Sequence, residues 1–167
     1  MLKQIELEQF TNVQKLIGKD WMLITAGDGD KVNTMTASWG CLGELWNKPV
    51  AICFIRPQRY TYEFTEKSDT LSLSFFDGEQ RPALALCGKV SGRDRDKIAE
   101  AGLSTAFCDG TPYIAEAHHV LICRKLYADD LKKECFIDKE PLRYYEAGDF
   151  HRVYVCEVEK IFVREKG

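Results

Sequence analysis

The sequence predicts a mainly β protein, an antiparallel barrel with short helical insertions. Several segments alternate apolar and polar residues with a period of two, which is the spacing of a half-buried strand. Glycine, proline, asparagine and aspartate gather between these segments, where turns are expected. The helical patterns between the strands are short, and no repeat or low-complexity stretch interrupts the chain.

Composition limits the possible functions. The 167 residues, 45% of them hydrophobic, are enough for one packed core, so we expect a single domain over 1–167. The net charge is only -3 and no basic block occurs, so nucleic acid is not expected as a partner. No apolar run approaches the about 18–20 residues of a membrane span, and the N-terminus lacks a signal-like apolar segment. We therefore expect a cytoplasmic protein with no membrane partner.

The seven cysteines do not indicate a metal site or a disulfide framework. No two of them have the C-x-x-C spacing that zinc and iron–sulfur sites usually need. Their odd number also argues against structural disulfides. We predict no metal and expect most of these thiols to be reduced and buried. His118 and His119 are adjacent and would point to opposite faces of a strand, so packing is the simpler explanation for the pair.

The N-terminal part of the chain predicts a β-hairpin. An arm and a short helix over 11–17 lead into strands at 21–26 and 33–40, which flank a turn at 27–30. On an extended strand, alternate side chains face opposite sides. The second strand therefore carries a hydroxyl row and an apolar row, which are Thr34, Thr36 and Ser38, and Met35, Ala37 and Trp39. The hydroxyl row either faces solvent or lines a shelf for a flat, partly polar ligand.

The rest of the chain predicts further strands with short helices between them, about six strands in all. A loop is expected at 42–48. Strands are expected at 49–55, 70–76, 113–127, 135–137 and 151–163. Helices are expected at 80–87 and 97–101, with a turn or helical segment at 141–146.

A helix start after the strand at 49–55 is suited to bind phosphate. Pro57 favours a helix start, and the first turn of a helix exposes N–H groups at the positive end of its dipole. Arg56, Arg59 and the Thr61 hydroxyl lie at the same place. The alternative is two surface arginines, with Arg59 paired to Glu63 one helical turn away.

A second group of cations precedes the helix expected at 97–101. Arg93 and Lys97 lie in or before its first turn, where positive charge opposes the dipole unless an anion is near. Asp94 or Asp96 can supply that negative charge instead of a bound phosphate. Ser91 or Asp94 is expected to cap the helix.

Three motifs in this order resemble the flavin reductase-like, FMN-binding split-barrel family, and most nearly its flavoredoxin-like branch. They are N-T-M-T-A-S-W-G at 33–40, R-P-Q-R-Y-T at 56–61, and S-G-R-D at 91–94 with Lys97. The segment after Asp149-Phe150-His151 also fits. The resemblance covers nearly the whole chain.

The resemblance implies a six-stranded antiparallel Greek-key split barrel that forms a homodimer with FMN near the interface. The first motif would line the isoalloxazine, the second would hold the phosphate and the ribityl chain, and the third would complete the phosphate end. The implied cofactor-binding residues are Asn33, Thr34, Met35, Thr36, Ala37, Ser38, Trp39, Arg56, Gln58, Arg59, Thr61, Ser91, Arg93 and Lys97. His151 matches a position near the flavin, and no catalytic acid or base is assigned.

An FMN site needs cations and an uncrowded shelf, but not the G-x-G-x-x-G turn of dinucleotide-binding folds, which this sequence lacks. The leading interpretation is an FMN-binding flavin reductase in which NADH or NADPH passes a hydride to flavin N5. One alternative is a flavoredoxin-like electron carrier that serves a redox partner protein. Another is an interaction module that binds no flavin. The first two need the same site, so the sequence does not separate them.

Overall fold

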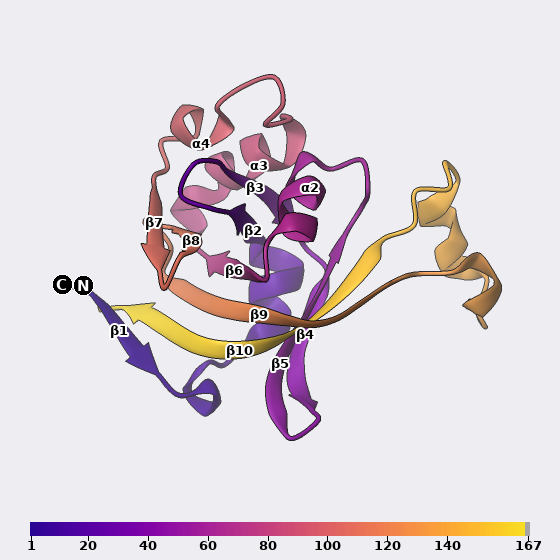
Figure 1. The fold of residues 1–167 in the computed structure, drawn as a ribbon, viewed down its shortest axis with the longest axis horizontal. Helices are drawn as coiled ribbons and strands as arrows, with labels where there is room; N and C mark the ends of the chain where they lie inside the picture. Colours follow the sequence, from indigo (N-terminus) through magenta and orange to yellow (C-terminus); the bar gives the residue numbers. More distant parts are fainter. Residues whose placement is uncertain (166–167) are drawn as a thin grey trace.

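A curved antiparallel sheet with short helices on its outside makes up the computed structural model, which describes residues 1–165 (Figure 1). Its eight strands follow the order β3-β2-β6-β9-β10-β5-β4, with β1 beside β10. Their bounds are β1 (Leu2–Ile5), β2 (Met22–Gly27), β3 (Val32–Ala37), β4 (Gly40–Leu45), β5 (Lys48–Ile55), β6 (Thr70–Phe75), β9 (His119–Asp130) and β10 (Arg152–Arg164). A separate hairpin, β7 (Thr105–Cys108) and β8 (Thr111–Ile114), packs against β6 and β2.

The sheet curls into an incompletely closed barrel. β3 and β4 lie at opposite ends of the strand order, yet only Ser38 and Trp39 separate them in the chain. The sheet must therefore bend round until its two ends approach each other at this link. The antiparallel barrel predicted from the sequence is confirmed, with eight strands in the main sheet where six were expected.

Short helices cover the outside of the sheet. They are α1 (Val13–Lys15) with a π-helical turn over Leu16–Asp20, α2 (Tyr60–Lys67), α3 (Arg81–Lys89) and α4 (Lys97–Glu100). Single 3₁₀ segments lie at Leu7–Gln9, Gly78–Gln80, Lys133–Cys135 and Glu140–Tyr145. α3 packs against β3, and α2 packs against β2 and β3, so these two helices flank the strand that carries the hydroxyl row. Within the described residues, no helix is long and apolar enough to cross a membrane.

Alternation along the strands builds two hydrophobic cores. On β2, Ile24 enters the core of the barrel, whereas Leu23 enters the core shared with α3. On β9, Leu121 enters the core of the barrel, and Val120 enters the core shared with α3. All four side chains are buried, and burying such a side chain stabilises the fold by about 1.5–3 kcal/mol. The period-two pattern that predicted the strands thus also separates the two cores.

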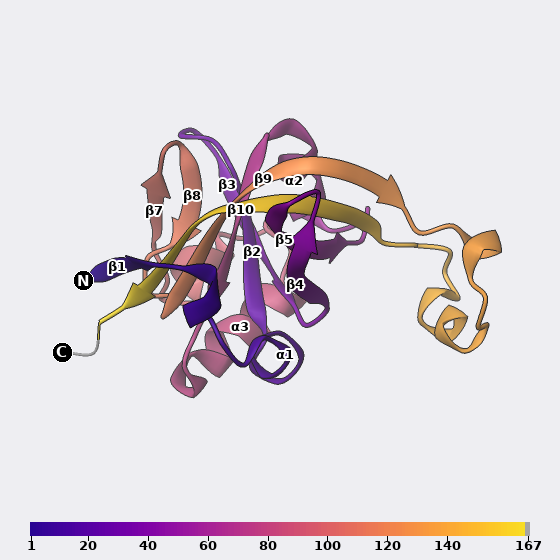
Figure 2. The ribbon, with the colours of Figure 1, turned by 90° about the horizontal axis from the view of Figure 1, so that it is seen from below.

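The ends of β9 and β10 extend beyond the barrel as an arm that carries residues 131–151 (Figures 1 and 2). The strand expected at 135–137 is wrong, because a 3₁₀ turn over Lys133–Cys135 occupies this region and Ile137 is fully exposed. Three residues that alternate weakly and have no sheet neighbour do not form a strand. The arm returns to the barrel where Asp149 meets Arg56.

The loop expected at 42–48 is also wrong, because β4 runs to Leu45 and pairs with β5. The two strands are joined by Trp46 and Asn47 alone, with φ of 57° and 56°. Positive φ at both central residues is the backbone of a two-residue hairpin turn. The usual Asn-Gly or Asp-Gly signal for such a turn is missing here, since a tryptophan occupies its first position.

Several element boundaries also differ from those expected. The strand expected at 113–127 is split between β8 and β9, and β7 was not predicted; neither was β1, which pairs with β10. α3 continues through Gly88 to Lys89. The cap of α4 is Asp96, whose side chain accepts from Ala99 N, and neither Ser91 nor Asp94 takes that position. α2 begins at Tyr60, so Pro57 lies in the turn before the helix.

Candidate functional site

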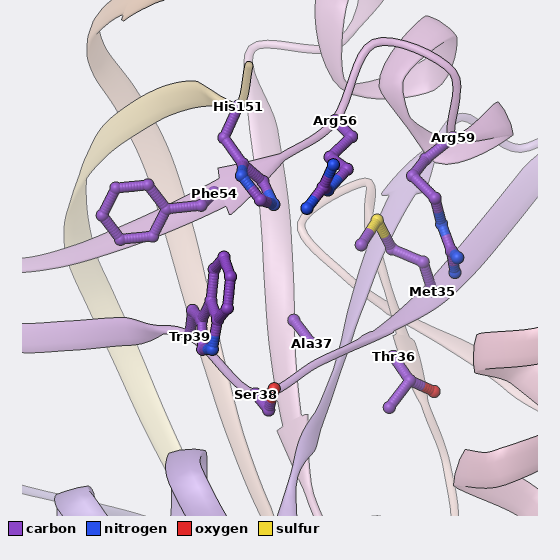
Figure 3. A pocket seen from close by; sticks show the side chains of 9 residues that line it. All are labelled: Met35, Thr36, Ala37, Ser38, Trp39, Phe54, Arg56, Arg59 and His151. Carbon is purple, nitrogen blue, oxygen red and sulfur yellow. The ribbon is translucent and has the colours of Figure 1, made fainter. Parts of the chain in front are cut away.

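A pocket of about 210 Å³ lies at the link between β3 and β4 (Figure 3). The end of β3, the end of β5 and the residue just before β10 contribute its walls. The lining residues are Met35, Thr36, Ala37, Ser38, Trp39, Phe54, Arg56, Arg59 and His151. β5 pairs with β10 through Ile55 and Arg152, and this pairing brings His151 beside Arg56.

One side of the pocket is aromatic. The ring centroid of His151 lies 5.2 Å from that of Trp39 and 6.4 Å from that of Phe54. Tyr144 packs edge-on against Trp39 at 5.2 Å. These rings come from the β3–β4 link, from β5 and from the base of the arm, so they form a wall only in the folded chain. Such a wall suits a flat ring system.

His151 is held as a neutral imidazole. Its Nδ1 shares a 2.8 Å hydrogen bond with the Tyr145 hydroxyl. Burial, followed by the charge of Arg56, lowers the pKa of His151 to about 4. At neutral pH the ring is therefore uncharged. Among the described residues Nε2 has no hydrogen-bond partner, so it remains able to bond a ligand.

Arg56 joins the pocket to the arm. Its guanidinium donates to the Asp149 carboxylate and to Tyr144 O (2.9 Å), and it lies 5.2 Å from the Tyr145 ring centroid. Gln58 Nε2 donates to the same carboxylate at 2.5 Å. The hydrogen bond from Arg56 lowers the pKa of Asp149. In this structure Arg56 and Gln58 thus hold the base of the arm.

Half-buried Arg59 and buried Lys97 are neighbouring cations at the C-terminal end of α3. Arg59 Nη1 donates to Gly88 O at 2.9 Å, and Lys97 Nζ donates to Cys87 O and Val90 O at 3.1 and 3.2 Å. The last carbonyls of a helix carry partial negative charge, which favours cations there. In the part of the chain that the structure describes, neither cation forms an ion pair with a carboxylate.

The electrostatics of these two cations indicate an anion site. Burial lowers the pKa of Arg59, and burial followed by the charge of Arg59 lowers the pKa of Lys97 to about 8. Lys97 is only 3% exposed. A buried and a half-buried positive charge, neither of them in an ion pair among the described residues, are stabilised by an anion such as a phosphate.

Asn33, Thr34 and Thr61 hold the framework around the pocket. Asn33 Nδ2 donates to Thr61 Oγ1 at 2.8 Å, and this bond ties the start of β3 to α2. Thr34 and Thr25 share a buried hydroxyl pair at 2.9 Å. These side chains do not line the pocket.

Arg93 and Ser91 lie on the loop beside the start of β3. Arg93 forms an ion pair with Glu63 and donates to Gln58 O at 3.2 Å, while Ser91 Oγ accepts from Arg93 N. Glu63 therefore pairs with Arg93, and the alternative pairing of Arg59 with Glu63 does not occur. Asn33, Arg93 and Lys97 line a neighbouring pocket of about 500 Å³, together with Asp30, Asp94 and Asp96. Of the candidate residues, Met35 to Trp39, Arg56 and Arg59 line the first pocket, and Asn33, Arg93 and Lys97 line the second. Thr34, Gln58, Thr61 and Ser91 line neither.

Replacing Gly92 with alanine is expected to lower the free energy of unfolding by about 1–2 kcal/mol. A Cβ at Gly92 would lie 2.1 Å from Asn33 Oδ1, and moving Asn33 would break its buried bond to Thr61. Urea denaturation measures the loss. Gly29→Ala is the matched control, because a Cβ there meets open space. Equal stability of the two variants would contradict the prediction.

Sequence reasoning missed four residues around the pocket, namely Phe54, Tyr144, Tyr145 and Asp149. Phe54 lies two positions before Arg56 at the end of a predicted strand, and the period of two shows that both share a face. The other three lie on the arm, where no periodic pattern relates them to the barrel. Only the fold brings them to the pocket.

Comparison with known proteins gives a family and a set of similar folds. Residues 16–167 match the family described as flavin reductase like domain. None of the curated proteins compared matches the chain.

Several solved structures are similar in fold. An FMN-binding domain of a flavin reductases-like enzyme from Shewanella baltica has a TM-score of 0.71 at 18% identity, over 98% of this chain and 77% of that one. Flavoredoxin from Methanosarcina acetivorans has a TM-score of 0.68 at 21% identity, over 87% and 69%. An NADH:FAD oxidoreductase from Streptomyces globisporus has a TM-score of 0.64 at 18% identity, over 87% and 75%.

Proposed function

The chain belongs to the flavin reductase like domain family, and from this membership we propose that it is an FMN-binding oxidoreductase. The observation that carries the proposal is the pair of cations formed by half-buried Arg59 and buried Lys97, which form no ion pair in the described chain and lie next to an aromatic pocket. A nucleotide with a flat ring and a terminal phosphate matches both features.

The residues fit FMN in two parts. The phosphate would lie by Arg59 and Lys97, neither of which is in an ion pair among the described residues. The isoalloxazine would lie along Met35 to Trp39, next to His151. The pocket volume of about 210 Å³ is below the ~300–1,000 Å³ usual for a drug-sized ligand. The ribityl chain and the phosphate would therefore extend over the neighbouring surface.

The chain's own residues would orient the ring and shield it from water. When bound, FMN supplies the redox centre that accepts a hydride at N5 from NADH or NADPH. Neutral His151 presents Nε2 to the pocket, held by Tyr145 at 2.8 Å, and would hydrogen-bond a polar edge of the ring. Trp39 and Phe54 would cover one side of the ring. Arg56 would place positive charge near the ring while it fixes the arm.

We propose that electrons come from a nicotinamide, so that the protein is a flavin reductase. An absorbance spectrum of the purified protein, followed by titration with NADH and NADPH in the presence of FMN, tests this directly. Steady oxidation of either nicotinamide supports a reductase. A flavin that stays oxidised with both, but is reduced by a protein donor, would favour the electron carrier. Colourless protein that takes up no FMN would contradict the whole proposal.

Binding of FMN is expected to weaken about 3- to 10-fold between pH 7 and pH 9. Burial holds the pKa of Lys97 at about 8 in the free protein. A phosphate beside it favours the charged form, so the bound protein keeps the proton to higher pH. Affinity is therefore nearly full at pH 7 and falls around and above pH 8 as Lys97 of the free protein loses its proton. Fluorescence titration at a series of pH values measures this.

Lys97→Arg is the control for this pH dependence, because a guanidinium stays charged throughout the range. The variant is expected to show a flat profile over the same interval. An equal slope in the variant and the parent protein would assign the titration to another group.

We also propose that the protein forms a homodimer with the pocket beside the interface, as the family resemblance implies. Trp39 and Tyr144 leave an aromatic rim 41% and 45% exposed at the pocket, which a second copy would cover. Light scattering after size-exclusion chromatography measures the mass. A monomer at micromolar concentration would contradict this arrangement.

A further inference from the structure

A second cavity of about 350 Å³ lies between α3 and the end of β3, next to the proposed flavin pocket. The two share Thr36 and Ser38 as walls. The remaining lining residues of the second cavity are Trp21, Leu84, Ala85, Gly88 and Lys89. The link between β3 and β4 therefore borders both cavities, and a ligand in one lies close to a ligand in the other.

Trp21 is a fixed aromatic wall of this cavity. Its backbone has φ 71° and ψ 163°, a conformation that tryptophan rarely adopts. The Arg81 guanidinium stacks on the indole at 3.1 Å from the ring centroid. The same guanidinium donates to Lys19 O at 2.6 Å and to Asp20 O at 3.3 Å. Backbone conformation, stacking and hydrogen bonds thus hold the indole in place before any ligand binds.

The cavity combines apolar walls with positive charge at its edge. Trp21, Leu84 and Ala85 supply apolar surface. Lys89 lines the cavity, and Arg81 lies against Trp21. Within residues 1–165, neither cation is in an ion pair with a carboxylate. This combination suits a flat aromatic ring that carries an anionic group.

We propose that this second cavity binds the adenosine phosphate part of a dinucleotide whose other half reaches the flavin pocket. The inference rests on the proposed function, since it places a redox dinucleotide across both cavities. The adenine ring would pack on Trp21, and a phosphate would lie by Lys89. Two dinucleotides share this chemistry, namely FAD in place of FMN, and NADPH as the electron donor.

Binding measurements with four variants test the proposal without relying on turnover. Trp21→Ala removes the aromatic wall, and Lys89→Gln removes the charge. Trp21→Phe is the conservative variant, and Lys133→Gln, on the distant arm, is the matched control. Dissociation constants are measured for FMN and FAD with the flavin-free protein, and for NADP⁺ with the FMN-loaded protein. Melting temperatures show that each variant is folded.

Trp21→Ala and Lys89→Gln are each expected to weaken one adenosine-bearing ligand at least about fivefold, with FMN binding unchanged. Trp21→Phe should retain most of the affinity, and Lys133→Gln all of it. A loss confined to FAD assigns the cavity to the flavin dinucleotide. A loss confined to NADP⁺ assigns it to the electron donor.

Two outcomes would overturn the inference. In one, neither FAD nor NADP⁺ binding responds to the substitutions. In the other, FMN binding falls as much as FAD binding, which would make the cavity part of the FMN site itself. Failure of the proposed function is distinguishable from both, because the parent protein would then bind no flavin. If the parent protein binds no flavin, titration with 5′-AMP still tests the second cavity alone. Equal AMP binding by the parent protein and Trp21→Ala would overturn the inference.

Discussion

Replacing Arg59 with alanine is expected to weaken FMN binding by more than tenfold. Arg59 lines the aromatic pocket, and its neighbour Lys97 shares Cys87 O with it at the end of α3. A charge-assisted hydrogen bond contributes about 1.5–3 kcal/mol, which corresponds to at least a tenfold change in affinity. Titration followed by flavin fluorescence gives the dissociation constant.

Two further variants make the test specific. Arg59→Lys keeps the charge but loses the planar donor pair, so it is expected to recover part of the affinity. Arg124→Ala removes an arginine that pairs with Glu157 and Glu159 on the sheet, away from the pocket, and should leave binding unchanged. If Arg59→Ala binds FMN as well as the parent protein, Arg59 is only a structural or solvated charge.

Acidification from pH 6.5 to pH 4 is expected to lower the free energy of unfolding by about 2–3 kcal/mol through two histidines. Burial first, and then the charge of His118, lowers the pKa of His119 to about 4; burial and Arg56 lower that of His151 to about 4. The unfolded chain takes up these protons near pH 6.5, whereas the folded chain does so only near pH 4. The stability that the two neutral histidines contribute is therefore fully present above pH 6.5 and is lost as the pH falls from 6.5 to 4.

Chemical denaturation at several pH values measures this loss. The charge of Asp77 raises the pKa of His119, and the charge of Asp149 raises that of His151. Burial lowers both pKa values by more than these carboxylates raise them. The double variant His119→Gln, His151→Gln cannot titrate in this range and is expected to lose much less stability. An equal loss in the parent protein and the double variant would assign the acid response to carboxylates instead.

Local sequence signals were enough for most of the sheet. The strands that became β2, β3, β5, β6 and β10 were predicted because each carries enough apolar residues at the right period, and tertiary packing did not override them. The turn at Trp46 and Asn47 was missed because Asn47 is preceded by a tryptophan and followed by no glycine, so the usual Asn-Gly or Asp-Gly signal is absent. The arm was missed because its short segments show no hydrophobic periodicity. Its position is set by the paired ends of β9 and β10, which the sequence does not relate to each other.

The candidate site was predictable to a similar degree. The segments at 33–40 and 56–61 were expected to approach each other. In the structure, the residues from Met35 through Trp39 and the side chain of Arg59 line the same pocket. Their binding of a flavin stays a prediction. The segment at 91–97 reaches an adjacent pocket, except that Lys97 also lies beside Arg59. Spacing along the chain does not show that Arg93 would pair with Glu63, because that contact depends on how α2 packs.

The bond between Arg56 and Asp149 joins residues 93 positions apart in the chain. Such distant contacts form slowly, since closing a long loop costs entropy before any contact repays it. Hairpins such as β2–β3 join near neighbours and form without that delay. During folding the pocket would thus be completed only when β5 pairs with β10, whose partners Ile55 and Arg152 are as distant in the chain. A newly made chain would form its local hairpins before it gains the ability to hold a ligand.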